Sequence, residues 1–218
     1  MPTKRSYGDP CGIARALDAV GERWALLVVR ELMLGPKRFT DLRAALPGLS
    51  ADILAQRLRE LGAAGVLARA TLPPPAASKV YELSERGREL EPVLLALGRW
   101  GSREPRLAGE RALGIDAFAL ALPTLFDAAA AERLRTTVEL RLGRDRFTAR
   151  VQDGRLDLRR APAEHPDAVV EGDTAALTQV LWHGQPLEAA EADDALRIAG
   201  DRHAALRFLK LFPLGERS

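Results

Sequence analysis

Hydrophobic residues recur at helical spacing from Leu49 to Gly65, in the stretch LSADILAQRLRELGAAG. Residues three and four apart share one face of a helix, so this spacing predicts an amphipathic helix. Ser50 stands where its hydroxyl caps the first turn, and Gly65 stands where the helix ends. The apolar stripe comprises Leu49, Ile53, Leu54, Leu58 and Leu61. The opposite, polar face comprises Asp52, Gln56, Arg57, Arg59 and Glu60.

Three further elements are predicted ahead of this segment. Residues 11–20 form an amphipathic helix, and residues 24–34 are apolar almost all round, which is typical of a buried helix. Residues 38–39 are predicted as a very short strand, and Thr40 as the N-cap of a helix that Pro47 and Gly48 end. Two short helices joined by a tight turn above a buried one is the helix-turn-helix arrangement.

A hairpin and a long helix are predicted to follow. Residues 66–84 hold two β-rich runs around a proline-rich tip, and Ser84 is placed to cap the helix ERGRELEPVLLALGRWGSRE. This helix carries an apolar stripe with no evident partner in so small a domain, which predicts a homodimer. The stripe comprises Leu90, Val93, Leu94, Leu97 and Trp100.

The second half of the chain predicts a separate α+β domain. Residues 105–114 are interpreted as a linker, so the predicted domains are 1–104 and 115–218. Residues 115–126 are predicted as a buried helix, with a strand as the alternative, and residues 127–133 as an Ala-rich helix.

From Val138 to Leu158 the period changes to two, which predicts three successive antiparallel strands with a turn at Asp153-Gly154. Residues 168–171 and 196–198 add short strands, and Asp173 and Asp201 cap two helices. The stretch EAAEADDA is interpreted as a solvated turn. Strands followed by helices indicate an α+β fold with an antiparallel sheet.

Composition and charge favour a globular protein that binds a polyanion through its first half. The chain is 47% hydrophobic and 28% charged, which is ordinary for a protein with a real core. Residues 1–104 hold 16 Lys+Arg and 12 Asp+Glu, a net +4, whereas residues 105–218 hold 16 and 18, a net −2. No apolar run predicts a membrane span or a signal peptide, so we expect a cytoplasmic protein.

The first half resembles the HxlR-type winged helix-turn-helix regulators, a branch close to the MarR group. The resemblance rests on CGIARALDAVGERWALLVVRELMLGPKRF, on TDLRAALPGLSADILAQRLRELGAAGVLAR and on VYELSERGRELEPVLLALGRWG. It implies a homodimer on double-stranded DNA, with the helix from Ser50 in the major groove and half-sites about 34 Å apart. Family members often carry a basic residue near the start of that helix, where this chain has Asp52.

Individual DNA contacts are predicted from side-chain chemistry. Gln56 and Arg57 are expected to reach base edges, while exposed basic and hydroxyl side chains are expected to contact phosphates. The predicted DNA-binding set is Arg38, Thr40, Arg43, Ser50, Asp52, Gln56, Arg57, Arg69 and Lys79.

Residues 134–213 resemble a sterol carrier protein-like domain. The resemblance rests on RFTARVQDGRLDLRR, on GDTAALTQVLWHG and on LRIAGDRHAALRFLKLF, and it implies an apolar ligand, such as a lipid, between sheet and helices. A packed core would use the same residues as a ligand cavity, and both interpretations stay open. The candidate lining residues are Phe118, Phe126, Leu181, Trp182, Phe208 and Phe212.

Other chemistry is sparse in this sequence. Cys11 opens the first helix, where the helix dipole favours thiolate, so it is either an oxidant sensor or a small packed residue. His165, His183 and His203 are scattered without cysteine partners, so we expect no metal site and no cofactor. No nucleophile elbow, phosphate-cradling loop or dinucleotide fingerprint occurs, so we expect no enzyme.

We therefore predict a dimeric DNA-binding transcription regulator whose second domain binds an apolar effector. Two alternatives remain. One is a lipid carrier whose first half is a protein-interaction module, which would lack salt-dependent affinity for duplex DNA. The other is a redox-sensing regulator that acts through Cys11.

Overall fold

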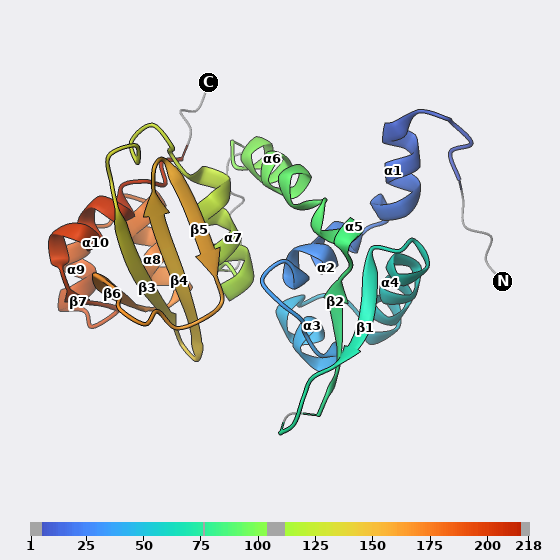
Figure 1. The fold of residues 1–218 in the computed structure, drawn as a ribbon, viewed down its shortest axis with the longest axis horizontal. Coiled ribbons are helices and arrows are strands. Elements are labelled where there is room, and N and C mark those ends of the chain that lie inside the picture. The colour runs from blue at the N-terminus through green and yellow to red at the C-terminus, as the bar shows by residue number, and fades with distance from the viewer. Residues whose placement is uncertain (1–5, 76, 104–111, 215–218) are drawn as a thin grey trace. The chain divides into compact units, whose positions relative to one another are not determined.

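The computed structural model describes residues 6–75, 77–103 and 112–214, and Figure 1 shows its elements. The chain divides into two compact units, residues 1–94 and 95–218. This division falls inside helix α6, Glu91–Gly101, ahead of the predicted domain end at residue 104. Most of the predicted linker, residues 105–114, lies outside the described residues.

Four helices open the first unit and enclose its core. Val28 and Val29 of the second helix are fully buried, because this helix is apolar on most sides and the third and fourth helices pack against it. Leu42 and Leu54, which are also fully buried, close the core from the third and fourth helices. The helices are α1 Gly12–Val20, α2 Ala25–Leu32, α3 Phe39–Ala45 and α4 Ala51–Ala63.

The predicted hairpin follows α4. Strands β1, Leu67–Thr71, and β2, Lys79–Leu83, pair antiparallel, and Gly65 leads into them with a φ of +70°. The strand predicted at residues 38–39 is wrong. Only Lys37 pairs with the hairpin, through two backbone hydrogen bonds with Tyr81 of 3.0 and 2.8 Å, because the chain turns into α3 directly afterwards.

The start of α3 also differs from the sequence-based prediction. Thr40 lies inside the helix rather than at its N-cap, which is Arg38. The Asp41 carboxylate accepts a hydrogen bond from the Arg38 backbone N–H at 3.1 Å, so an acidic side chain of the first turn satisfies the N-cap backbone.

The single long helix predicted after Ser84 is in fact two. Ser84 Oγ accepts a hydrogen bond from the Gly87 N–H at 3.0 Å and caps α5, Glu85–Arg88. Pro92 lacks an N–H to donate to the carbonyl of Arg88, so the chain leaves the helix and starts α6 anew.

The second unit is built on a five-stranded sheet in the order β5-β4-β3-β6-β7. The prediction of an antiparallel sheet is wrong at one position, since β3 and β6 run parallel while the other neighbours are antiparallel. After β5 at one edge, the chain crosses to the far side of β3 before β6 begins, and hydrophobic periodicity does not encode that crossing. The strands are β3 Thr136–Leu142, β4 Asp145–Gln152, β5 Arg155–Arg159, β6 Ala168–Gly172 and β7 Leu196–Gly200.

Helices pack on the sheet and bury one of its faces. Helix α10 contacts β3, β6 and β7, α9 contacts β7, and α7 contacts β5 and α8. In Figure 1, α8 is seen behind β3 and β4. Alternate residues of β3 and β4, such as Leu140 and Phe147, are fully buried, as the period of two predicts. The helices are α7 Ile115–Leu125, α8 Thr174–Trp182, α9 Leu187–Ala192 and α10 Arg202–Leu209.

Two further predictions in this unit are corrected. Residues 127–133 form turns instead of an Ala-rich helix, and the Asp127 carboxylate accepts hydrogen bonds from the Ala129 and Ala130 N–H groups at the start of these turns. The predicted solvated turn at EAAEADDA begins inside α9, where Leu187 and Ala190 are buried. Among the described residues, no helix is long and apolar enough to cross a membrane.

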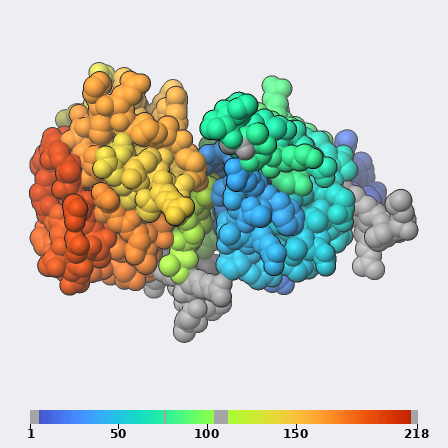
Figure 2. Space-filling model, turned by 90° about the horizontal axis from the view of Figure 1, so that it is seen from below, coloured from blue at the N-terminus to red at the C-terminus, as the bar shows by residue number. Residues whose placement is uncertain are grey.

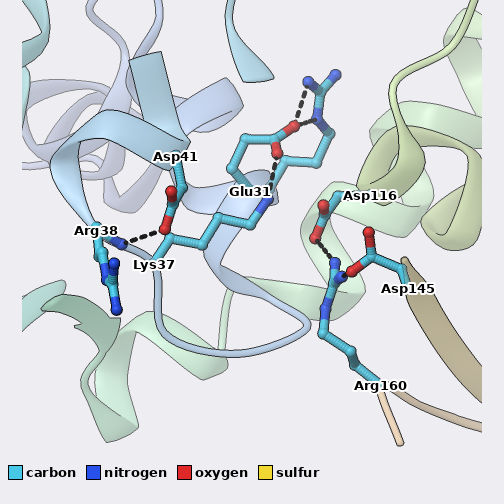
Figure 3. Close-up of polar contacts among 8 residues, drawn as sticks. Glu31, Lys37, Arg38, Asp41, Asp116, Asp145 and Arg160 are labelled. Carbon is cyan, nitrogen blue, oxygen red and sulfur yellow. Dashed lines mark hydrogen bonds and ion pairs between the residues drawn. The ribbon is translucent and has the colours of Figure 1, made fainter. Parts of the chain in front are cut away.

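An ion network connects α7 with the strands of the second unit. Arg160, just after β5, donates to the buried carboxylate of Asp116 at 2.6 Å and also pairs with Asp145 (Figure 3). Its guanidinium carbon lies 4.7 Å from the centre of the Phe147 ring. These contacts fix the first turn of α7 against the strands.

Candidate nucleic-acid interface

Helix α4 is anchored by its apolar side and capped as the sequence predicts. Ser50 Oγ accepts a hydrogen bond from the Ile53 N–H at 3.3 Å. Leu54, Leu58 and Leu61 are at most 3% exposed. The cap and the core contacts together hold the helix in one orientation, so the same side chains of α4 always point away from the core.

The outward side of α4 begins at Asp52. At about 100° per residue, Arg59 lies roughly 20° from Asp52 around the helix, and Gln56 lies roughly 40° away on the other side. Asp52 and Arg59 are exposed, and Gln56 is half-buried. The Gln56 side-chain amide donates a hydrogen bond to the Glu60 carboxylate at 2.9 Å, which orients it. This surface, defined by Asp52, Gln56 and Arg59, is called the α4 outer face below.

Arg57 differs from its predicted role as a base contact. Its side chain is 8% exposed and lies on the anchored side of α4, three residues after Leu54. The guanidinium is 2.8 Å from the Glu60 carboxylate and 3.2 Å from that of Glu22. Its charge is therefore neutralised inside the first unit. Arg59 is the arginine that points outward, and its angular position relative to Asp52 is the signal that marks it.

Ile53 also differs from its prediction as a member of the buried stripe. Its side chain is 42% exposed, whereas its stripe neighbours Leu49 and Leu54 are buried. The reason is angular: Ile53 lies about 100° from Leu54 around the helix, at the margin of the anchored side.

A buried carboxylate holds the elements around the helix-turn-helix together. Glu31 of α2 has a side chain only 3% exposed, and it binds Arg30 and Lys37, each at 2.7 Å (Figure 3). Through its backbone, Lys37 also pairs with Tyr81 of β2. Lys37 thus connects α2 and the hairpin to the segment that leads into α3. The positive charges of Arg30 and Lys37 compensate the buried negative charge of Glu31.

Basic and hydroxyl side chains are exposed on α3 and on the hairpin. Arg38, Thr40 and Arg43 are exposed at or near α3, as are Arg69 and Lys79 on the hairpin. In Figure 2, α3 in light blue and the hairpin in green are both visible on the same face of the first unit.

A shallow groove lies between α4 and the hairpin. Its volume is about 300 Å³, and two arginines, Arg59 and Arg69, line it from the two elements. The Arg69 guanidinium carbon is 5.7 Å from the centre of the Tyr81 ring, which holds this side chain over the strand. The lining residues are Leu58, Arg59, Gly62, Leu67, Ala68, Arg69 and Tyr81.

The predicted dimerisation stripe is split by the structure. Leu90 and Leu94 are partly buried and pack against the core of the first unit. Val93, Leu97 and Trp100 are 53%, 46% and 65% exposed. The break before Pro92 leaves only Leu90 outside α6. Leu94 lies on α6 with the three exposed residues, and it differs from them because it packs against the core of the first unit.

The six candidate lining residues of the second unit lie largely in contact with one another. The ring centres of Phe118 and Trp182 are 5.6 Å apart, and Phe212 lies 6.1 Å from Phe126 and 5.0 Å from Phe208. The Trp182 Nε1–H donates to the Phe212 carbonyl at 2.9 Å, while Leu181 is half-buried beside it. These contacts make an aromatic cluster between α7, α8 and the end of α10.

Cys11 is exposed and directly precedes α1, and its backbone N–H donates to the Asp9 carboxylate at 2.8 Å. Within the described part of the chain, no group of His, Cys, Asp and Glu side chains is arranged to hold a metal ion.

Helices α3 and α4, the tight turn between them, the buried α2 and the following hairpin define a helix-turn-helix protein with a wing, the hairpin being the wing. A profile of the HxlR-like helix-turn-helix family matches residues 19–106. The chain belongs to this family.

Relatives that are similar to the chain are named as transcriptional regulators. The uncharacterized HTH-type transcriptional regulator YvaP of Bacillus subtilis is 36% identical over 40% of this chain and 82% of its own length. An uncharacterized HTH-type transcriptional regulator of Synechocystis, sll1512, is 40% identical over 44% of this chain and 70% of its own. The solved structure of the redox regulator HypR in its oxidized form is 31% identical, with a TM-score of 0.41, over 44% of this chain and 100% of its own.

Proposed function

We propose that the protein regulates transcription by inserting the α4 outer face into the major groove of duplex DNA. The observation that carries this proposal is the division of α4 into a buried leucine side and an outward polar side that holds Asp52, Gln56 and Arg59. Gln and Arg are suited to read base edges in the major groove, and Asp accepts from the cytosine amino group. Ser50 contributes by capping the helix at the end that approaches the bases.

In this proposal, the surrounding side chains contact phosphates and set the register of α4. On one side of α4, the DNA phosphates are contacted by Arg38, Thr40 and Arg43. On the side of the wing, they are contacted by Arg69 and Lys79. Their exposure and their positive or hydroxyl character support this role. Arg57 is not part of the DNA contact, because it is occupied by Glu22 and Glu60.

The proposed regulator is a homodimer. Val93, Leu97 and Trp100 lie at helical spacing and expose large apolar surfaces on α6, as Ile13 and Leu17 do on α1. Apolar stripes of this size favour burial against a second copy, and a two-fold dimer matches a two-fold related DNA site.

The second unit is proposed to bind an apolar small molecule that alters DNA affinity. The aromatic cluster of Phe118, Phe126, Trp182, Phe208 and Phe212 supports this, because apolar and aromatic side chains make up most of the lining of small-molecule sites. The ligand changes DNA affinity only by as much as it prefers one arrangement of the protein over another.

Fluorescence anisotropy of labelled duplexes with the full chain, at two salt concentrations, tests DNA binding. We expect affinity to fall as salt rises, because bound phosphates release counterions. Arg43→Ala should weaken binding to all duplexes alike and lower the salt slope by about one. Arg155→Ala, an exposed arginine of β5, is the matched control and should leave the slope unchanged. Absence of salt-dependent duplex affinity in the unmodified protein would overturn the proposal.

A further inference from the structure

An exposed isoleucine lies at the margin of the buried side of α4, next to polar residues. Ile53 is 42% exposed at the third position of the helix, and its neighbours on the helix surface, three and four residues on, are Gln56 and the ion-paired Arg57. A β-branched residue is a poorer helix former than alanine or glutamine, so helix propensity does not account for isoleucine here, and its packing against the core is incomplete.

The other large exposed apolar side chains of the first unit's described residues lie elsewhere. They occur on α1, α2, α6 and the segment before α1, so Ile53 is the one large apolar side chain of α4 that is exposed. An isolated apolar side chain among hydrogen-bonding groups fits a surface that is itself mostly polar with single apolar points. The major groove is such a surface, because each thymine presents one methyl group among donors and acceptors.

The position of Ile53 along the helix agrees with that partner. The N-terminal residues of the second helix of a helix-turn-helix are those that meet base edges, and Ser50 fixes this end through its hydrogen bond to the Ile53 N–H. Ile53 and Gln56 are three residues apart and therefore neighbours on the helix surface. The amide of Gln56, held by Glu60, keeps a second N–H and its oxygen for an adenine edge.

We propose that Ile53 is a specificity-determining residue that packs against the 5-methyl group of a thymine in each half-site. The inference rests on the proposed DNA-binding function and refines it, since it assigns one contact that reads sequence without a hydrogen bond. The protein then distinguishes thymine from uracil at that base, although the two pair identically.

The test begins with duplexes that the full chain selects from a random library. Each thymine of the selected half-site is replaced in turn by deoxyuridine, which removes only the methyl group. We expect one position per half-site at which affinity falls about fourfold, the amount that burial of one methyl group contributes. In Ile53→Ala, the thymine and uracil duplexes should bind equally at that position. Alanine is the better helix former, so this variant should fold.

Ile13→Ala is the matched control, since Ile13 is 72% exposed on α1 and the same atoms are removed. It should keep the thymine-to-uracil ratio of the unmodified protein, whatever it does to overall affinity. If the protein binds duplexes but no thymine position responds, or the response persists in Ile53→Ala, the inference fails while DNA binding stands. If Ile53→Ala instead lowers self-association measured by sedimentation and leaves the ratio intact, Ile53 belongs to an interface between copies and the inference is likewise overturned. If the protein binds no duplex at all, the proposed DNA-binding function itself is wrong.

Discussion

At the scale of single residues, two arginines on α4 have opposite environments, one buried and one exposed, although they are only two positions apart. Arg57 is buried beside Leu54 and neutralised by two glutamates, whereas Arg59 is exposed on the α4 outer face. Two residues turn the helix by about 200°, so neighbours of identical chemistry point to opposite environments. Charge alone therefore does not identify which arginine is available to DNA.

Arg57→Ala and Arg59→Ala should separate stability from binding. Arg57→Ala should lower the free energy of unfolding by about 1–2 kcal/mol, because it removes a packed side chain and two ion pairs whose glutamates stay partly solvated. Arg59→Ala should leave stability nearly unchanged and weaken duplex binding about tenfold. Urea unfolding and duplex anisotropy measure the two effects, and equal losses of stability in both variants would contradict the assignment.

Glu139 is a second residue whose environment is not evident from its type. It alternates along β3 with the buried Val138 and Leu140 and so points to the other face of the sheet, yet its side chain is only 4% exposed. Burial raises the pKa of Glu139, but hydrogen bonds from Arg141 and the Ala163 N–H, with the charges of Arg141 and Arg146, outweigh it. The pKa is therefore held below its ordinary value of 4.5.

The lowered pKa of Glu139 makes a pH-dependent contribution to stability. Because the folded pKa lies below 4.5, the contribution is complete above that pH and is lost as the pH falls through the folded pKa. Glu139→Gln should be about 1 kcal/mol less stable than the unmodified protein at neutral pH, and the difference should shrink in acid. Urea unfolding between about pH 3 and pH 7 measures it, and a difference that does not vary with pH would refute this account.

At the scale of elements, helix α6 carries apolar residues in two different environments. The break before Pro92 leaves Leu90 outside α6, while the other four members of the predicted stripe lie on it. Leu90 and Leu94 pack against the core of the first unit, whereas Val93, Leu97 and Trp100 stay exposed. Leu94 and Leu97 share one helix, so packing against the core of the first unit separates residues that stabilise the fold from residues that we propose to hold the dimer.

Leu97→Ala should weaken self-association about tenfold, since each copy loses a buried leucine side chain at the interface. Leu27→Ala is the matched control, because Leu27 is a leucine of α2 with a similar exposure of 39%. Sedimentation equilibrium measures both variants. Equal self-association of Leu97→Ala and the unmodified protein would exclude α6 from the interface.

At the scale of the whole molecule, the chain joins a family helix-turn-helix unit to a second unit with its own sheet and core. The family profile ends at residue 106, whereas the second unit continues to residue 218. A separate core can bind and respond to a ligand independently. If the ligand biases the DNA-binding unit, linkage requires the effect to be reciprocal.

Fatty acids of increasing chain length, titrated into the complex of the full chain with its selected duplex, should change DNA affinity by about five- to tenfold once the chain length fits. The duplex should change fatty-acid affinity by the same factor, which calorimetry can measure. If fatty acids bind without changing duplex affinity, the second unit is not an effector domain of the proposed kind. If none binds, the aromatic cluster is packed core only.

The sequence by itself determined most of the elements and their caps. Ser50, Ser84, Asp173 and Asp201 cap helices as predicted, and the alternation through β3 and β4 buries the expected face. Family membership followed from the same local patterns. These features depend on hydrogen bonds between residues about four positions apart or less, or on the period of apolar side chains along one element. Both can be read from neighbouring residues of the sequence.

Tertiary structure alone decided what depends on residues distant in the chain. Arg57 is buried and ion-paired, with Glu22 approaching it from the loop after α1. Lys37 pairs with Tyr81 in place of a predicted strand, and β6 lies parallel to β3. Periodicity predicts which residues share one face of an element. Which other element covers that face depends on how all the elements pack together, so it cannot be read from one stretch of sequence.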